Sequence, residues 1–207
     1  MTPKRERPRF GPDVSLDRPA YIDPDARVFG KVFIGEGASL WPYAVVRAEA
    51  HEVRIGRFSN IQDHAMLHIG AGAAVIGDYC SIAHHAVVHS ATVGDNTLIG
   101  INATLMDGVA VGANCVVAGG AFLTEGTVVP DNSIVMGMPG KVVRAKNSFL
   151  QTRRNALIYH RNALAYAQGD HRTWTGPEFE AWQAAMLEEL EAEFRRLHPE
   201  AGGASPA

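Results

Sequence analysis

The sequence predicts a parallel β-helix followed by α-helices, and three observations lead to that fold class. Aliphatic residues recur every six positions over most of the chain, and small residues follow them at a constant offset. Beyond residue 145 the apolar spacing changes to three or four, which is the period of a helix. The chain therefore divides into a long repetitive domain and a helical C-terminal part.

The repeat domain is predicted to span residues 14–144. A period of six matches neither a strand (about 2.0) nor a helix (about 3.6), but it suits a short strand followed by a corner. Three such sides close a triangular coil of about eighteen residues, and stacked coils form a solenoid. The aliphatic residue that opens each hexapeptide then lines the axis, as expected for Leu16, Ile22, Val28, Ile34, Leu40, Val46, Ile55, Ile61, Leu67, Ile76, Ile82, Val88, Val93, Ile99, Leu105, Val111, Val117 and Leu123.

A small or medium residue usually lies four places after the aliphatic one and is expected to fill the remaining interior. Both cysteines, Cys80 and Cys115, occupy this position. We therefore interpret them as buried thiols rather than as a disulfide or a thiolate metal site.

The flanking segments have other patterns. Residues 1–13 read as a solvated N-terminal arm, 145–200 as C-terminal helices and 201–207 as a frayed, disordered tail. Helices are expected over 147–168, ending at Gly169, and over 177–197, where Thr175 to Glu178 resembles a capping box. An apolar stripe on the second helix is expected to pack on the solenoid or on a neighbouring subunit; it comprises Phe179, Trp182, Met186, Leu190, Phe194 and Leu197.

Composition excludes several classes of partner. The formal net charge is −3, so no strong positive field points to nucleic acid or to an anionic membrane. We see no membrane-spanning apolar stretch and no secretory signal, and we expect a cytoplasmic protein.

Three histidines carry the functional prediction. His68 directly follows the opener Leu67, and His89 directly follows the opener Val88, so both occupy the same corner position of adjacent coils. Adjacent coils lie ~4.8 Å apart. Two imidazoles at that separation can converge on one metal ion at ~2.0–2.1 Å from each nitrogen.

His84 occupies a different side of the coil, two places after Ile82. It is poorly placed to reach the same ion within one chain, but a neighbouring chain can supply it. The register therefore predicts a trimer with metal sites between subunits. Insertions of three residues before Ile55 and before Ile76 fall at one corner of successive coils, which is typical of a functional face.

Polar residues around the histidines complete a specific pattern. Asn60-Ile61-Gln62-Asp63 precedes His68, Ile82-Ala83-His84 precedes His89, Arg47 ends an earlier strand, and the segment 134–144 leads out of the repeats. Together they resemble the signature of γ-class carbonic anhydrases, in the hexapeptide-repeat superfamily of left-handed β-helices. The resemblance covers roughly residues 14–144.

The resemblance implies a left-handed coil, a homotrimer and one metal ion at each subunit interface. Zinc (Zn2+) is the expected metal, with Fe2+ and Co2+ as alternatives. The metal ligands would be His68 and His89 of one chain and His84 of the next. The resemblance also assigns Gln62 and Asn60 to positioning water and bicarbonate, and Arg47 and Asp63 to a salt bridge across the interface.

The implied reaction is the reversible hydration of carbon dioxide to bicarbonate, because zinc held by imidazoles lowers the pKa of bound water to ~7. The chain departs from the family pattern near the site. Ala48-Glu49 follows Arg47 where Gly-Asp is usual, so Glu49 keeps the charge on a longer arm. Ala50 and the loop 69–74 lack the glutamates that serve some relatives as proton shuttles.

Three other residues near the site are candidates for carrying the released proton. Tyr159 can reach the site, but its phenol, with a pKa of ~10, is a poor shuttle. His51 or His64 could carry the proton, and His64 is a candidate for contact with the metal ligands. Two alternative functions remain open: a hexapeptide-repeat acyltransferase, and a catalytically weak trimeric module that binds metal.

Overall fold

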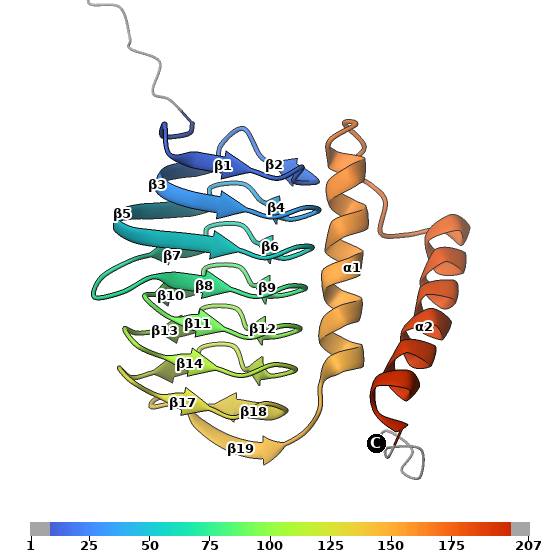
Figure 1. Ribbon diagram of the computed structural model, residues 1–207. Coiled ribbons are helices and arrows are strands. Elements are labelled where there is room, and N and C mark those ends of the chain that lie inside the picture. The colour runs from blue at the N-terminus through green and yellow to red at the C-terminus, as the bar shows by residue number, and fades with distance from the viewer. Residues whose placement is uncertain (1–8, 200–207) are drawn as a thin grey trace, which may run out of the picture.

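The computed structural model describes residues 9–199, which form a parallel β-solenoid of about seven turns followed by two helices (Figure 1). The fold predicted from the six-residue period is confirmed. The solenoid has three faces, because successive strands of each coil belong to three different ladders.

The strands of each face are parallel and lie one coil apart. The first face contains β1 (Val14–Leu16), β8 (Ala74–Ile76), β11 (Thr92–Val93), β14 (Ala110–Val111) and β17 (Val128–Val129). The second contains β2 (Tyr21–Ile22), β4 (Ser39–Leu40), β6 (Asn60–Ile61), β9 (Ser81–Ile82), β12 (Leu98–Ile99), β15 (Val116–Val117) and β18 (Ser133–Met136). The third contains β7 (Met66–His68), β10 (Val87–His89), β13 (Thr104–Leu105) and β16 (Phe122–Leu123).

Two long strands, β3 (Arg27–Ile34) and β5 (Val45–Ile55), run around the corner between the third and first faces. The solenoid ends in β19 (Lys141–Ala145), which turns back antiparallel to β18. These exceptions lie at the corner where the insertions were predicted and at the exit of the solenoid.

The core is the column of aliphatic side chains predicted from the repeat. From Val28 to Leu123 the hexapeptide openers are at most 3% exposed. At the open N-terminal end the column is less complete, since Leu16 is 45% exposed. Arg9 and Phe10, placed in the solvated arm by the sequence, instead contact the solenoid: Arg9 donates to the carbonyls of Ile22 and Asp23, and Phe10 packs on the core. Residues 1–8 of the predicted arm and the predicted C-terminal tail lie outside the described residues.

Both predicted insertions lie at the corner between the third and first faces. In β5, Ala48 pairs with Gly30 and Glu52 pairs with Lys31, so residues 49–51 have no partner in β3. Gly30 has φ +82°, and a Cβ there would lie 1.7 Å from the carbonyl oxygen of Ala48, so only glycine fits this crossing. The second insertion is the loop 69–73 between β7 and β8.

The first helix, α1 (Phe149–Tyr166), lies along the second face, and the second, α2 (Pro177–Leu197), lies on the outer side of α1 (Figure 1). Gly169, with φ +81°, follows the end of α1, as predicted. The apolar stripe of α2 is directed at α1 rather than at the solenoid. Its buried members are Met186 and Leu190, and Phe194 lies 5.8 Å from Phe149 between ring centroids.

The predicted capping box of α2 is wrong. The N-cap residue is Gly176, no side chain caps the helix, and Pro177 occupies the first turn. With the cap at Gly176, Thr175 lies one residue outside the helix, so the Thr175 to Glu178 spacing is out of register. Proline suits this position because the first N–H groups of a helix have no intrahelical partner.

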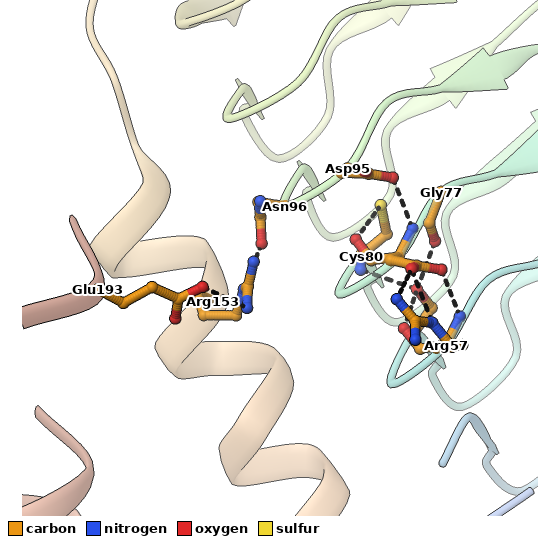
Figure 2. A network of polar contacts seen from close by, with 9 residues as sticks. Arg57, Gly77, Cys80, Asp95, Asn96, Arg153 and Glu193 are labelled. Atoms are coloured by element: carbon orange, nitrogen blue, oxygen red, sulfur yellow. Dashed lines mark hydrogen bonds and ion pairs between the residues drawn. The ribbon is translucent and has the colours of Figure 1, made fainter. Parts of the chain in front are cut away.

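Arg153 joins α1 to its neighbours on both sides (Figure 2). Its guanidinium donates to the side-chain oxygen of Asn96 at 2.5 Å, at a solenoid corner, and lies 3.4 Å from the carboxylate of Glu193 on α2. It also stacks over Tyr79, with Cζ 3.7 Å from the ring centroid. Through these three contacts Arg153 connects both helices to the solenoid. Neither helix is both long and apolar enough to cross a membrane.

The buried thiols give a test of the packed core. Burial raises the pKa of Cys80 to about 12 and raises that of Cys115 as well. We expect neither thiol to react with a water-soluble disulfide reagent at pH 8 in the native protein, and both to react after unfolding in guanidinium chloride. Rapid labelling of either cysteine in the native protein would contradict the tight core.

Candidate metal centre

His68 and His89 lie side by side on the third face. Each is the last residue of its strand, and the register pairs His68 of β7 with His89 of β10. Their ring centroids are 5.0 Å apart and their planes are inclined by 57°. The side chains are 21% and 28% exposed, so each keeps an accessible edge. The adjacency predicted from the repeat register is confirmed.

Arg47 lies in the same row, one coil earlier, and pairs with His68 in the register. Its guanidinium forms an ion pair with Glu49, whose other oxygen lies 3.4 Å from Nε2 of His68. Desolvation opposes ionisation of Glu49, but the hydrogen bond and charge of Arg47 prevail and hold its pKa below the ordinary value. An ionised carboxylate therefore lies beside the histidine pair.

His89 is oriented by Asp107, a residue that the sequence analysis did not identify. Nδ1 of His89 lies 2.7 Å from one oxygen of Asp107, and the other oxygen accepts the backbone N–H of Ala71 at 2.9 Å. The bond from Ala71 and the weaker effect of His89 lower the pKa of Asp107 despite some desolvation. Since an ionised carboxylate only accepts, the neutral imidazole of His89 carries its proton on Nδ1 and presents a lone pair on Nε2.

His84 lies at the corner that follows β9 on the second face. Its Nδ1 is 3.0 Å from the carboxylate of Asp63, and its Nε2 is 3.4 Å from the hydroxyl of Tyr159 on α1. By the same argument Asp63 leaves a lone pair on Nε2 of His84. Burial raises the pKa of Tyr159 to about 12, so its hydroxyl is neutral at physiological pH and does not release a proton there.

Asn60 and Gln62 begin a buried chain of polar side chains under α1. The amide of Gln62 donates to Asn60 at 2.9 Å, and the amide of Asn60 donates to the hydroxyl of Ser81 at 2.9 Å. Asn155 of α1 donates to the same hydroxyl at 2.8 Å. Gln62 and Asn60 are 3% and 1% exposed, so their orientation is set by these bonds.

One chain arranges the candidate residues in two separate groups. His68, His89, Arg47 and Glu49 lie on the third face, whereas His84, Asp63, Gln62, Asn60 and Tyr159 belong to the second face and its corner. Within residues 9–199 no three His, Cys, Asp or Glu side chains gather closely enough to hold a metal ion. The Arg47–Asp63 salt bridge is not formed within the chain, and as a contact between subunits it stays a prediction.

His64 takes part in a stack of rings at the corner beside Asp63. It lies between Tyr43 and His85, with centroid distances of 5.0 and 4.8 Å. All three residues have left-handed backbone conformations that repeat from coil to coil. Within one chain His64 contacts these two rings, and a contact with the histidine ligands at a subunit interface stays a prediction.

A pocket of about 410 Å³ lies between this corner, α1 and the segment that connects the helices. His84 and Asp63 line one part of it, and further polar side chains line the part formed by α1 and the connecting segment, namely Asn162, His171, Arg172, Thr173 and Thr175. Aromatic rings make up much of the rest, contributed by Trp41, Tyr159, Tyr166 and Trp174. The candidate ligand His84 is therefore reached from a cavity rather than from a flat surface.

Comparison with known proteins shows the family to which the chain belongs. A model described as the hexapeptide repeat of succinyl-transferase matches residues 90–125. A probable carbonic anhydrase of Methanocaldococcus jannaschii is 41% identical over 137 residues, which are 65% of this chain and 86% of that protein. The chain belongs to the γ-carbonic anhydrase-like family of hexapeptide-repeat proteins.

Two further similarities agree with this membership. The mitochondrial γ-carbonic anhydrase 1 of Arabidopsis thaliana is 34% identical over 174 residues, covering 80% of this chain and 63% of the plant protein. A crystal structure of a hexapeptide transferase family protein from Anaplasma phagocytophilum superposes with a TM-score of 0.72 at 30% identity, over 76% of this chain and 96% of that one. The γ-carbonic anhydrase-like fold thus occurs in proteins with transferase names as well.

The buried polar chain gives a test of how the site is held. Asn60→Ala removes an acceptor of Gln62 and a donor to Ser81, both in a buried setting, so we expect a loss of roughly 1–3 kcal/mol in the free energy of unfolding. Thermal or denaturant unfolding measures it, with Gln151→Ala on the exposed side of α1 as control. Equal stability of the two variants would show that the polar chain does not hold Asn60 and Gln62.

Proposed function

We propose that this γ-carbonic anhydrase-like protein is a metal-dependent enzyme that hydrates carbon dioxide reversibly to bicarbonate at sites between the subunits of a homotrimer. The observation that carries the proposal is the pairing of His68 with His89, one coil apart and next to Arg47. The names of relatives support the choice of reaction, since proteins similar over much of this chain are named carbonic anhydrases.

The residues present fit a divalent metal. Carboxylates hold the Nδ1 protons of His89 and His84, so the Nε2 atom of each ring carries a lone pair that can bind a metal ion. The ligands would be His68 and His89 of one chain and His84 of the next, because one chain does not bring the three together. Three imidazoles with a further position free for water are typical of catalytic zinc, and Fe2+ or Co2+ suit the same donors.

When bound, zinc of this kind supplies a nucleophile at neutral pH by lowering the pKa of water to ~7. The reaction consumes carbon dioxide and water and yields bicarbonate and one proton. Gln62, held by Asn60, offers a fixed amide that orients water or a bicarbonate oxygen by hydrogen bonding. The guanidinium of Arg47 is paired with Glu49, so the two together add no net charge beside the histidine pair.

The released proton needs an acceptor near the site. Tyr159 does not serve, because its pKa of about 12 keeps it protonated. Glu49 is ionised and lies beside His68, and it is 51% exposed, so it can pass a proton to solvent or buffer. Despite desolvation, Arg47 lowers the pKa of Glu49, which makes it a weaker base than an imidazole, so His51 and His64 stay candidates for the proton transfer beside it.

Acyl transfer is the second candidate. The pocket of about 410 Å³ beside His84 has room for more than carbon dioxide, and the Anaplasma phagocytophilum structure bears a transferase name. A third reading, a metal-binding module with little turnover, uses the same histidines. The three differ in metal content and in rate, so the same purified protein distinguishes them.

Metal analysis and stopped-flow hydration test the proposal together. We expect about one zinc or iron per chain and a hydration rate well above that of buffer, both lost in His89→Ala because a three-ligand site loses one ligand. A full metal load with no rate above buffer would leave only the metal-binding module. Absence of metal, together with transfer from an acyl-CoA, would favour the acyltransferase.

Arg47 gives a test of the assembly. As the proposed partner of Asp63 in the next subunit, Arg47 should stabilise the trimer, and Arg47→Ala should weaken association by ~1 kcal/mol or more. Sedimentation velocity over a dilution series would then show a slower species at low concentration. Arg54→Ala, an exposed arginine of the first face, is the matched control. Identical profiles for both variants would remove Arg47 from the interface.

A further inference from the structure

Hydrogen bonds with the side chains of Ser90 and Asp107 hold the loop 69–73 beside His89. The hydroxyl of Ser90 accepts the backbone N–H of Gly70 and donates to the carbonyl of Gly72 at 3.0 Å. Asp107 accepts the N–H of Ala71 at 2.9 Å with one oxygen and meets Nδ1 of His89 at 2.7 Å with the other. The same carboxylate therefore holds the loop and the imidazole.

The backbone of Gly70 lies directly beside the His89 ring and the Asp107 carboxylate. A Cβ built on Gly70 would lie 2.6 Å from Cε1 of His89 and 2.6 Å from the Asp107 oxygen. No positive φ accounts for the glycine, so close approach to the ring is the reason that a side chain does not fit. By contrast, a Cβ on Gly72 meets nothing within 4 Å. The backbone of Gly70 thus limits the tilt of the His89 ring.

We propose that Asp107 and Gly70 are positioning residues that fix the tautomer and the orientation of His89 before metal binds. This inference rests on the proposed function in taking His89 as a metal ligand. Asp107 sets the proton on Nδ1 and leaves the Nε2 lone pair for the metal, and Gly70 packs against the ring edge. Neither residue contacts the reacting atoms, so both act through His89.

The chemistry of an amide in place of Asp107 makes the role testable. In Asp107→Asn one side-chain oxygen remains. If that oxygen keeps the bond from Ala71, the NH2 group faces Nδ1 of His89 and requires it to accept. The ring proton then moves to Nε2, the atom that the metal needs. Mutation of a residue that holds a metal-binding histidine in this way typically weakens metal affinity by ~10–100-fold.

The first experiment compares metal affinity in two pairs of variants by competition with a chelator. Asp107→Asn should bind zinc roughly 10–100-fold more weakly than wild type. Asp131→Asn is its control, because Asp131 likewise accepts a backbone N–H, from Ala113 at 2.8 Å, with no histidine beside it. Gly70→Ala should weaken binding by about tenfold or more, whereas Gly72→Ala should match wild type.

The second experiment uses metal-free protein, so it does not depend on the proposed function. The 15N NMR signals of the imidazole of His89, assigned with His89→Gln, should show a protonated Nδ1 in wild type and a protonated Nε2 in Asp107→Asn. If wild type binds no metal but Asp107→Asn changes the tautomer as stated, the proposed function is wrong, and the effect of Asp107 on the tautomer of His89 is confirmed. If wild type binds metal and Asp107→Asn changes neither tautomer nor affinity, the positioning role is wrong. Circular dichroism of each variant shows that it is folded.

Discussion

Parallel stacking of the coils is the constraint on which the rest of the structure depends. Each coil repeats the path of the one before it, so residues in register stand one above another across the ~4.8 Å between strands. The buried column of aliphatic side chains keeps that register, because a slip by one residue would turn the column toward solvent. Arg47, His68 and His89 form a row for this reason, and their spacing is set by the backbone rather than by flexible side chains.

The site adds acidic residues to this frame. Asp107 and Asp63 each hold the Nδ1 side of a histidine, and Glu49 pairs with Arg47 beside His68. Helix α1 contributes Tyr159 and Asn155, which contact His84 and the buried polar chain. The solenoid therefore sets where the ring atoms lie, while carboxylates and the helix set which nitrogen is free. These are separate constraints, and they come from different parts of the chain.

The sequence predicts the fold well because a six-residue period leaves few other solutions, and it places His68 beside His89 from register alone. It does not predict Asp107, whose contact depends on the path of the loop 69–73, although extending the register by one coil would have pointed to that corner. The sequence places the N-cap of α2 one residue too early, at Thr175, whereas the helix begins after Gly176. The sequence does not predict that α2 packs on α1, because an apolar stripe indicates a packing surface but not the element that covers it.

The central claim is that one metal site requires two chains, and mixing two defective variants tests it most directly. His89→Ala lacks part of the histidine pair, and His84→Ala lacks the partner's ligand. When the two variants are unfolded together in equal amounts and refolded, each mixed trimer should contain one complete site. Counted over the whole mixture, unmixed trimers included, about a quarter of all sites should be complete. Tight zinc binding restored to about that fraction, and absent from either variant alone, is the predicted result. No recovery in verified mixed trimers would contradict the account.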